Sequence, residues 1–365
     1  MPRTARRCWT LMLTLAMAPP ALAFQRPILA IALKRHECTR VLPGFAHRVH
    51  ASAPVVLRHG LHGNIPGVRG IRASSKGANG PPGGKTMTVA TWNVNSVRQR
   101  LPSIQRYLEE HQPDVLALQE TKCPDENFPA GELRELGYHV ATAGQKSYNG
   151  VAILAKHPIS DLHVGLPDSQ TDPLEPQARY IEGVVCGVCI CNVYVPNGNP
   201  VQSDKFEYRQ RFMGRLIRRV SALCSSHQVP FMLVGDFNCV PRDQDCYDAA
   251  EMADDAVMHP ISRKQFRELS YLMGLYNSID LHLARAAARE GSAIEAGQGA
   301  RAHGGVFSYW DYRAGCWEKG KGLRIDHILL HPELADAQLG AGVHAQTRGW
   351  PTPSDHAPVW VKIKI

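Results

Sequence analysis

From residue 87 to the end of the chain, short apolar runs alternate with longer amphipathic segments. Thr88–Trp92, Val115–Leu118 and Phe231–Val234 have the length and composition of buried strands. Lys205–Leu223 instead places apolar residues at helical spacing, with basic residues between them. Strands and helices that alternate in this way bury their apolar faces as sheets covered by helices. The pattern therefore predicts one α/β domain over residues 87–365.

The remaining expected elements follow the same spacing. Further strands are predicted at Gly150–Leu154, Ile181–Val185, Val188–Val195, Leu323–Leu330 and Ala357–Ile363, and further helices from a Ser96 cap to about Glu110 and over Ser262–Met273. The stretch Ala284–Gly305 is rich in Ala and Gly. We expect it to form a long surface loop or a short exposed helix.

The charge of the chain is divided unevenly. Residues 1–86 contain 13 Lys or Arg and a single acid, Glu37, whereas residues 87–365 contain 28 Lys or Arg and 32 Asp or Glu. The basic character therefore belongs to the N-terminal segment, and the predicted domain is slightly acidic. The net charge of this domain therefore gives no reason to expect nucleic-acid binding. An anionic substrate needs a local patch or bound cations.

The segment 1–86 has no pattern of a folded domain. Arg3, Arg6 and Arg7 precede the apolar stretch Trp9–Ala18, as in a secretory signal, but the following residues show no period. Three interpretations stay open: a disordered basic extension, translation upstream of a true start at Met87, or an export signal.

Two classes of protein are excluded. No apolar run approaches the roughly 20 residues that a membrane-spanning helix needs, so we expect no membrane association. The ten cysteines do not look like a disulfide framework. Alternation places Cys189 and Cys191 on one strand face and Cys186 on the other, so they do not converge as a tetrahedral zinc site requires. Small buried side chains in a reducing compartment, the cytoplasm, explain them best.

Polar side chains stand where several predicted strands end. They carry carboxylate, amide or imidazole groups. Asn93, Glu120, Asp236, Asn238 and Asp326 follow apolar runs, and Asp355 and His356 lie just before the last predicted strand. If these strand ends are neighbours, several carboxylates converge, and like charges raise one another's pKa unless a cation neutralises them. Oxygen ligands without paired thiolates favour a hard ion, Mg²⁺ or Mn²⁺.

Each of these residues also has an ordinary structural explanation. Asp236 and Asn238 fit an Asx turn, Glu120 fits a solvated strand boundary, and Asn93 fits a helix cap. Tyr194 fits a buried strand aromatic, although the turn that follows places it at a strand end. The joint occurrence of these residues, in this order along the chain, favours a catalytic site.

The short sequence motifs that contain these residues, taken in order, closely resemble those of the exonuclease III branch of the endonuclease/exonuclease/phosphatase superfamily, the class II apurinic/apyrimidinic endonucleases. LQET, GDFN and SDH are shared across the superfamily, whereas NVYVPNG, SYWDYR and GLRID point to the DNA-repair branch. The resemblance covers Met87–Ile365. It implies a four-layered α/β sandwich, with two mixed β-sheets packed face to face and helices outside.

The resemblance also implies a role for each polar residue. It makes Glu120 the principal metal ligand in a metal and phosphate pocket that also contains Asn93, Asp236, Asn238, Asp355 and His356. Asp236 is then the base that activates water, and Asn238 orients that water. Tyr194 and His356 donate to the phosphoryl oxygens, with His356 held by Asp326.

DNA contacts are implied as well. Arg179, Asn197 and His356 are expected at the DNA, and Trp310 is expected to form the wall of a pocket for the abasic sugar. The expected activity is Mg²⁺-dependent incision 5′ of abasic sites, with 3′–5′ exonuclease activity on duplex DNA; Mn²⁺ is expected to substitute. The expected partner is double-stranded DNA with abasic sites or 3′ ends, bound by a monomer.

Two alternatives remain at this point. One is a superfamily phosphatase or phospholipase that acts on inositol phosphates or lipid head groups, against which GLRID and SYWDYR argue. The other is a non-catalytic DNA-binding relative, against which the complete set of carboxylates, amides and imidazole argues.

Overall fold

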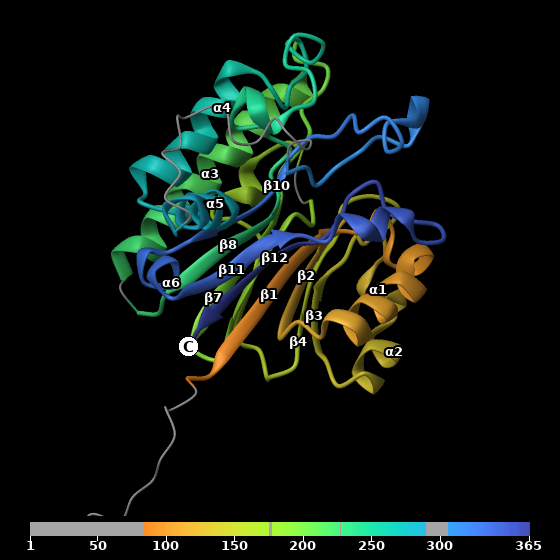
Figure 1. Ribbon diagram of the computed structural model, residues 1–365, viewed down its shortest axis with the longest axis vertical. Helices are drawn as coiled ribbons and strands as arrows, with labels where there is room; N and C mark the ends of the chain where they lie inside the picture. Colours follow the sequence, from red (N-terminus) through yellow and green to blue (C-terminus); the bar gives the residue numbers. More distant parts are fainter. Residues whose placement is uncertain (1–83, 175–176, 227, 290–305) are drawn as a thin grey trace, which may run out of the picture. The chain divides into compact units, whose positions relative to one another are not determined.

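A computed structural model describes residues 84–174, 177–226, 228–289 and 306–365, within a compact unit that spans Gly77–Ile365. Two six-stranded sheets pack face to face, and helices cover their outer faces (Figure 1). Each sheet contains one parallel pair of strands, β1 with β2 and β7 with β8, among antiparallel neighbours. The predicted α/β sandwich with two mixed sheets is therefore confirmed.

The two sheets have the following strand orders. The first runs β11 (Gln338–Val343), β12 (Val359–Lys364), β1 (Thr86–Asn93), β2 (Val115–Gln119), β4 (Val151–Ala155) and β3 (His139–Ala143). The second runs β5 (Ser160–Val164), β6 (Tyr180–Val185), β7 (Val188–Tyr194), β8 (Phe231–Asp236), β10 (Asp326–Leu330) and β9 (Tyr276–Asn277).

The helices form the outer layers. They are α1 (Val97–His111), α2 (Ala130–Glu135), α3 (Asp204–Ser226), α4 (Pro260–Arg267), α5 (Ser278–Arg289) and α6 (Pro332–Asp336). α1 and α2 cover the first sheet, and α3 and α4 cover the second (Figure 1). None of the described helices combines the length and apolarity that crossing a membrane requires.

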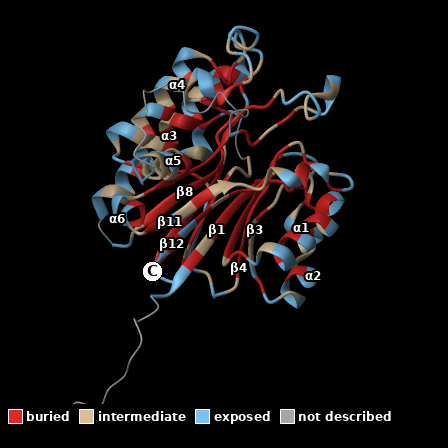
Figure 2. Ribbon diagram, viewed as in Figure 1, coloured by how far each residue is buried: buried red, intermediate tan, exposed pale blue. Residues whose placement is uncertain are grey.

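Three apolar layers hold the sandwich together. Side chains such as Val89, Ile190 and Ile328 fill the space between the sheets, and they are fully buried. Leu216 of α3 belongs to the layer between that helix and the second sheet, and Ile104 of α1 belongs to the layer between α1 and the first sheet. Figure 2 shows the strands buried between exposed helix surfaces. Burial on both faces explains why most strands read as continuous apolar runs rather than as alternating ones.

Most predicted elements are present, and four details differ. Ser96 precedes α1 but makes no side-chain cap; its φ is 96°, and its amide donates to the carbonyl of Glu120 instead. The predicted helix Ser262–Met273 corresponds to α4 followed by a π-turn. The predicted strand Leu323–Leu330 begins only at Asp326, because Leu323 pairs with the separate residues Cys246 and Tyr309.

The fourth difference lies in the Ala- and Gly-rich stretch. Its first part, up to Arg289, continues α5, which packs against β10 and β11. Residues 290–305 of the predicted loop lie outside the described residues. The described cysteines are all free, and Cys189 and Cys191 are buried on one face of β7.

His344 packs against the rings of Tyr107 and His111, near the C-terminal end of α1. The ring of His111 stacks on it with centroids 3.9 Å apart, and its Nδ1 lies 3.0 Å from the hydroxyl of Tyr107. Burial, and then the proximity of His111, lower the pKa of His344 to about 4. The folded protein therefore holds this imidazole neutral at ordinary pH.

Protonation of His344 is expected to destabilise the fold under acidic conditions. Its folded pKa lies below the ordinary value of 6.5, so its contribution is complete above that pH and is lost as the pH falls toward 4. We expect a loss of about 1–2 kcal/mol from this group between pH 7.5 and pH 5. Denaturant titrations of wild type and His344→Gln at both pH values measure it. An equally steep pH dependence in the variant would contradict the assignment.

Candidate active site

The strand register brings the polar strand ends to one level. In the second sheet, Tyr194 and Asp326 both pair with Asp236 from opposite sides. In the first sheet, Asn93 pairs with Gln119, the residue before Glu120. The predicted convergence at one end of the sandwich is therefore present in the structure.

Gly235 makes this register possible in β8. Its φ is 141°, a conformation that residues with a side chain rarely adopt. A Cβ at this position would lie 1.9 Å from the carbonyl oxygen of Val193 in β7. The glycine of the GDFN string thus allows the close parallel pairing that places Asp236 beside Tyr194.

Glu120 sits immediately after β2 in the left-handed region, with a φ of 50°. Its Oε1 accepts hydrogen bonds from Asn93 Nδ2 at 2.9 Å and from the Tyr194 hydroxyl at 2.8 Å. Its Oε2 lies 2.8 Å from Lys122 Nζ. Burial would raise the pKa of Glu120, but Lys122 and the Asn93 amide lower it overall. The carboxylate is therefore ionised and tightly oriented.

Asp236 lies at the centre of the cluster. Its Oδ2 accepts from Asn93 Nδ2 at 3.0 Å and from Asn238 Nδ2 at 3.2 Å, and its Oδ1 accepts from the Asn238 amide at 2.8 Å. Burial, and then repulsion from Asp326, raise the pKa of Asp236 to about 7. Such a carboxylate is poised to exchange a proton near neutral pH.

His356 and Asp326 form a buried pair. Nδ1 of His356 lies 2.8 Å from Asp326 Oδ2, and Nε2 lies 4.0 Å from Asp236 Oδ2. Burial alone would lower the pKa of His356, but the charge and hydrogen bond of Asp326 raise it to about 10. The imidazole is therefore a cation in the folded protein. Its contact with Asp326, which the sequence predicted, is present.

The cluster opens into a cavity of about 550 Å³. Its polar lining includes Glu120, Tyr194, Asn197, Asp236, Asn238, Asp355 and His356, and its other walls include Tyr247, Met252, Val257, Tyr309, Leu323 and Ile325. Asn93 and Asp326 lie buried behind this lining. A group that enters the cavity therefore meets carboxylate, amide and basic groups, among them Asp255, Arg313 and Lys321, as well as apolar side chains.

The predicted DNA-contacting residues fall in different places. Asn197 lines the cavity, and its Nδ2 donates to Asn238 Oδ1 at 3.0 Å. The guanidinium of Arg179 lies 4.5 Å from the ring centre of Tyr194 and donates to the carbonyl of Tyr194 at 3.3 Å. DNA contacts by these two residues stay predictions.

Trp310 does not line this cavity, although it was expected in a pocket wall. Its side chain is buried, with the ring of Trp317 4.9 Å away and that of Phe307 6.4 Å away. Successive side chains of an extended segment point to opposite sides, so the neighbouring Tyr309 faces the cavity instead. A role for Trp310 at the DNA stays a prediction.

Several residues that support the site escaped the sequence analysis. Gln119 Nε2 donates to Thr91 Oγ1 at 2.8 Å and to Asn192 Oδ1 at 2.7 Å, which joins the two sheets behind the site. Asn95 Nδ2 donates to Asp355 Oδ1 at 3.1 Å. A polar residue inside an otherwise apolar strand, as at Asn192, is a signal that could have revealed this network.

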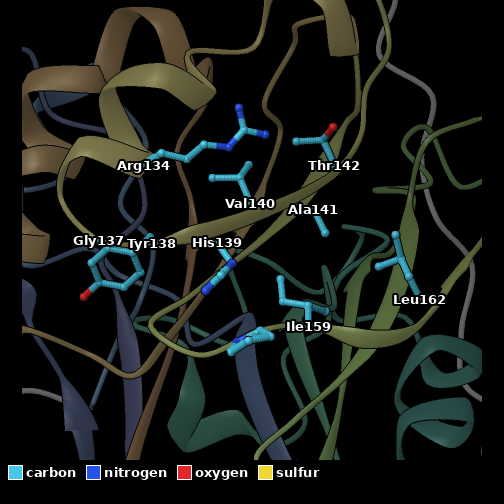
Figure 3. Close-up of a pocket in the computed structure, with 10 residues that line it drawn as sticks. Arg134, Gly137, Tyr138, His139, Val140, Ala141, Thr142, Ile159 and Leu162 are labelled. Atoms are coloured by element: carbon cyan, nitrogen blue, oxygen red, sulfur yellow. The ribbon is translucent and has the colours of Figure 1, made fainter.

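A second cavity, of about 750 Å³, lies elsewhere, beside the edge strands of the two sheets. Figure 3 shows its labelled lining, which includes Arg134, His139, Ile159 and Leu162. It contains no carboxylate among its lining residues. The larger cavity therefore lacks the chemistry of the first, and we assign it no part in catalysis.

The donor groups of the site fit a hard cation. Glu120, Asp236 and Asp355 line one cavity, and their ligand atoms are oxygens. Oxygen atoms of Asp236 and Asp326 and a nitrogen of His356 lie within 4.8 Å of one another, and repulsion between the two carboxylates already raises the pKa of Asp236. A bound cation would relieve this repulsion.

Comparisons with known proteins agree with this geometry. The model of the Endonuclease/Exonuclease/phosphatase family matches residues 90–356. The chain is 30% identical to the exodeoxyribonuclease III of Haemophilus influenzae over 289 residues, which cover 76% of this chain and 100% of that protein.

Two solved structures are similar over 76% of this chain and 100% of their own. The 3′ phosphatase NExo from Neisseria, bound to a product DNA hairpin, is 36% identical with a TM-score of 0.67. An AP endonuclease from Archaeoglobus fulgidus is 28% identical with a TM-score of 0.65. Since the family model matches more than half of the chain, the chain belongs to the endonuclease/exonuclease/phosphatase family.

Proposed function

We propose that the protein is a DNA-repair phosphodiesterase, an apurinic/apyrimidinic endonuclease with 3′–5′ exodeoxyribonuclease activity on duplex DNA. The observation that carries this proposal is the cluster of polar groups in the lining of the cavity. There a carboxylate with a pKa of about 7, Asp236, lies beside a cationic imidazole, His356, and an ionised carboxylate, Glu120. Hydrolysis of a phosphodiester needs a base, donors to the phosphoryl oxygens, and neutralisation of charge.

Each group has a place in this chemistry. Asp236 takes a proton from the attacking water, which Asn238 orients from two residues away. His356, kept cationic by Asp326, donates from Nε2 to a phosphoryl oxygen as negative charge develops on it. The Tyr194 hydroxyl, which donates a hydrogen bond to Glu120 in this structure, can turn to donate to the same phosphoryl group. Together these groups stabilise the transition state more than the bound substrate.

The metal ion of the proposal is Mg²⁺, for which Mn²⁺ substitutes. Glu120 is its principal ligand, and the other candidate ligands are Asn93, Asp236, Asn238, Asp355 and His356. When bound, the ion neutralises charge on the phosphate. The all-oxygen character of the carboxylate and amide donors supports a hard ion. Cationic His356 is the least suited of the six to bind it.

The finer parts of the proposal concern the chain as a whole. Residues 1–86 form a basic extension and residues 87–365 the nuclease domain, which acts as a monomer in the cytoplasm on duplex DNA with abasic sites or 3′ ends. The first described strand begins at Thr86, next to the proposed boundary. The names of the H. influenzae and A. fulgidus relatives support the two nuclease activities.

A third activity deserves the same assay, because a relative with 36% identity is named a 3′ phosphatase. The same groups that attack a phosphodiester could remove a terminal phosphate, since both reactions place water on phosphorus. Four substrates separate the candidates: a duplex with an abasic site, a recessed 3′ end, a 3′-phosphate end, and inositol polyphosphate. Turnover of the DNA substrates that EDTA abolishes supports the proposal. Turnover of inositol polyphosphate alone would replace it.

Glu120→Gln is expected to cripple hydrolysis and leave DNA affinity and fold largely intact. The amide keeps the shape of the side chain but removes the charge that binds a hard cation. We expect at least a roughly tenfold loss at low Mg²⁺, partly recovered at high Mg²⁺. Hydrolysis rates measured over a Mg²⁺ titration test this. The control is Glu110→Gln, which makes the same change at an exposed glutamate that pairs with Arg106. Near-normal rates at low Mg²⁺ would refute the metal assignment.

Asp236→Asn is expected to lose more rate than Glu120→Gln when Mg²⁺ is saturating. The change removes the proposed base, which is worth on the order of 10²- to 10⁴-fold. Single-turnover rates at saturating Mg²⁺ measure the loss, and Asp243→Asn at an exposed ion pair is the matched control. A loss of less than about tenfold would assign the base role to another group.

The N-terminal segment is expected to affect DNA affinity and not chemistry. A chain that begins at Gly84 keeps all of the proposed site and loses twelve of the 13 basic residues of the segment. At low salt the full chain should bind duplex DNA more tightly, and its advantage should shrink as the logarithm of the salt concentration rises. Equilibrium binding and single-turnover rates of both chains measure this. A shortened chain that is unfolded, or inactive at every salt concentration, contradicts the proposed division.

A further inference from the structure

Ser308 is fully buried, next to Tyr309, which lines the cavity. Its amide donates to the carbonyl of Leu323 at 2.9 Å, and its carbonyl accepts from the amide of Ala357 at 2.8 Å. These two bonds fix the segment between the residues that lead into β10 and those that lead into β12. Ser308 therefore occupies one defined position beside both catalytic strand ends.

The hydroxyl of Ser308 uses its full hydrogen-bonding capacity. It donates to Asp326 Oδ2 at 2.7 Å and accepts from the amides of Ile325 at 3.2 Å and Asp326 at 3.1 Å. A hydroxyl offers one donor and two acceptor sites. The two amides orient the oxygen, so its single proton is directed at the carboxylate.

Asp326 has few other restraints. Its Oδ2 also accepts from His356 Nδ1 at 2.8 Å, whereas its buried Oδ1 has no hydrogen-bond partner in the described part of the chain. Apart from His356 itself, Ser308 is thus the one described side chain that bonds this carboxylate. Rotation of the carboxylate would carry the imidazole with it.

The residue after Ser308 touches the same imidazole. The ring centre of Tyr309 lies 4.9 Å from that of His356, and Tyr309 lines the cavity. One short segment therefore holds Asp326 by a hydroxyl and packs an aromatic ring against His356. The position of the catalytic pair and the shape of the cavity wall are linked through the backbone of this segment.

We propose that Ser308 is a positioning residue for the hydrolysis. It holds the Asp326 carboxylate so that the His356 ring keeps its Nε2 near Asp236, 4.0 Å from Oδ2. The inference rests on the proposed nuclease function for its kinetic test. It rests on the structure alone for its spectroscopic test, so that failure of one can be told from failure of the other.

Three substitutions test the hydroxyl. Ser308→Ala removes it, Ser308→Cys keeps the size with a weak donor, and Ser308→Thr keeps the hydroxyl. We expect kcat to fall about 10- to 100-fold in the Ala and Cys variants with KM for DNA unchanged, and Thr to restore most of it. Ser262→Ala is the control, because its buried hydroxyl bonds to Ala256 and Arg209 on another part of the chain. Thermal unfolding checks that each variant is folded at the assay temperature.

A double-mutant cycle separates positioning from general damage. If Ser308 acts through Asp326, then Ser308→Ala should cost little further activity in an Asp326→Asn background. An equal loss in both backgrounds would overturn the proposal, as would a Ser308→Ala enzyme with wild-type kcat. If the Ala variant is unfolded, the same cycle with Ser308→Cys decides.

Proton NMR gives the test that needs no turnover. The Nδ1 proton of His356, shared with a buried carboxylate, should give a low-field signal that is absent in His356→Gln. We expect this signal to broaden or disappear in Ser308→Ala and Ser308→Cys and to persist in Ser308→Thr and Ser262→Ala. A signal that is unchanged in all four variants would show that Ser308 does not hold the pair.

Discussion

The convergence of four carboxylates, Glu120, Asp236, Asp326 and Asp355, is the constraint on which the site depends. Left alone, these charges would repel one another in a buried place. Three kinds of contact offset this repulsion: Lys122 pairs with Glu120, and the cationic imidazole of His356 pairs with Asp326. The side-chain amides of Asn93 and Asn238 donate hydrogen bonds to Asp236. The remaining repulsion contributes to the raised pKa of Asp236, which suits the proposed roles of this carboxylate as a base and as a ligand to a cation.

The sandwich is the device that creates this convergence. Parallel pairing of β7 with β8 and of β1 with β2 brings strand ends of each sheet to the same edge, and the buried contact between Gln119 and Asn192 ties the two sheets together behind them. The cost is local backbone strain, which is visible at Glu120 and Asn238, both in the left-handed region. Apolar packing on both sheet faces supplies the stability that this strain consumes.

The sequence predicted much of this and missed parts for physical reasons. Strands buried on both faces, such as β2 and β8, can be predicted because they are continuous apolar runs. The exposed edge strand β5 and the two-residue strand β9 have no such run. The residues at the strand ends were predicted as a group because five of them follow apolar runs and Asp355 and His356 stand just before the last strand. Ser308 and Trp310 depend on side-chain direction in an irregular segment, which no periodicity defines.

In the proposed reaction, water that is activated at this cluster attacks the phosphorus 5′ of an abasic site. Incision of an abasic-site duplex in water enriched in oxygen-18, followed by mass spectrometry of both product ends, tests it most directly. We expect a 3′-hydroxyl without label and one labelled oxygen on the 5′-phosphate of the abasic fragment. An unlabelled phosphate with an unsaturated sugar at the 3′ end would show that the strand is cut by elimination and would exclude hydrolysis.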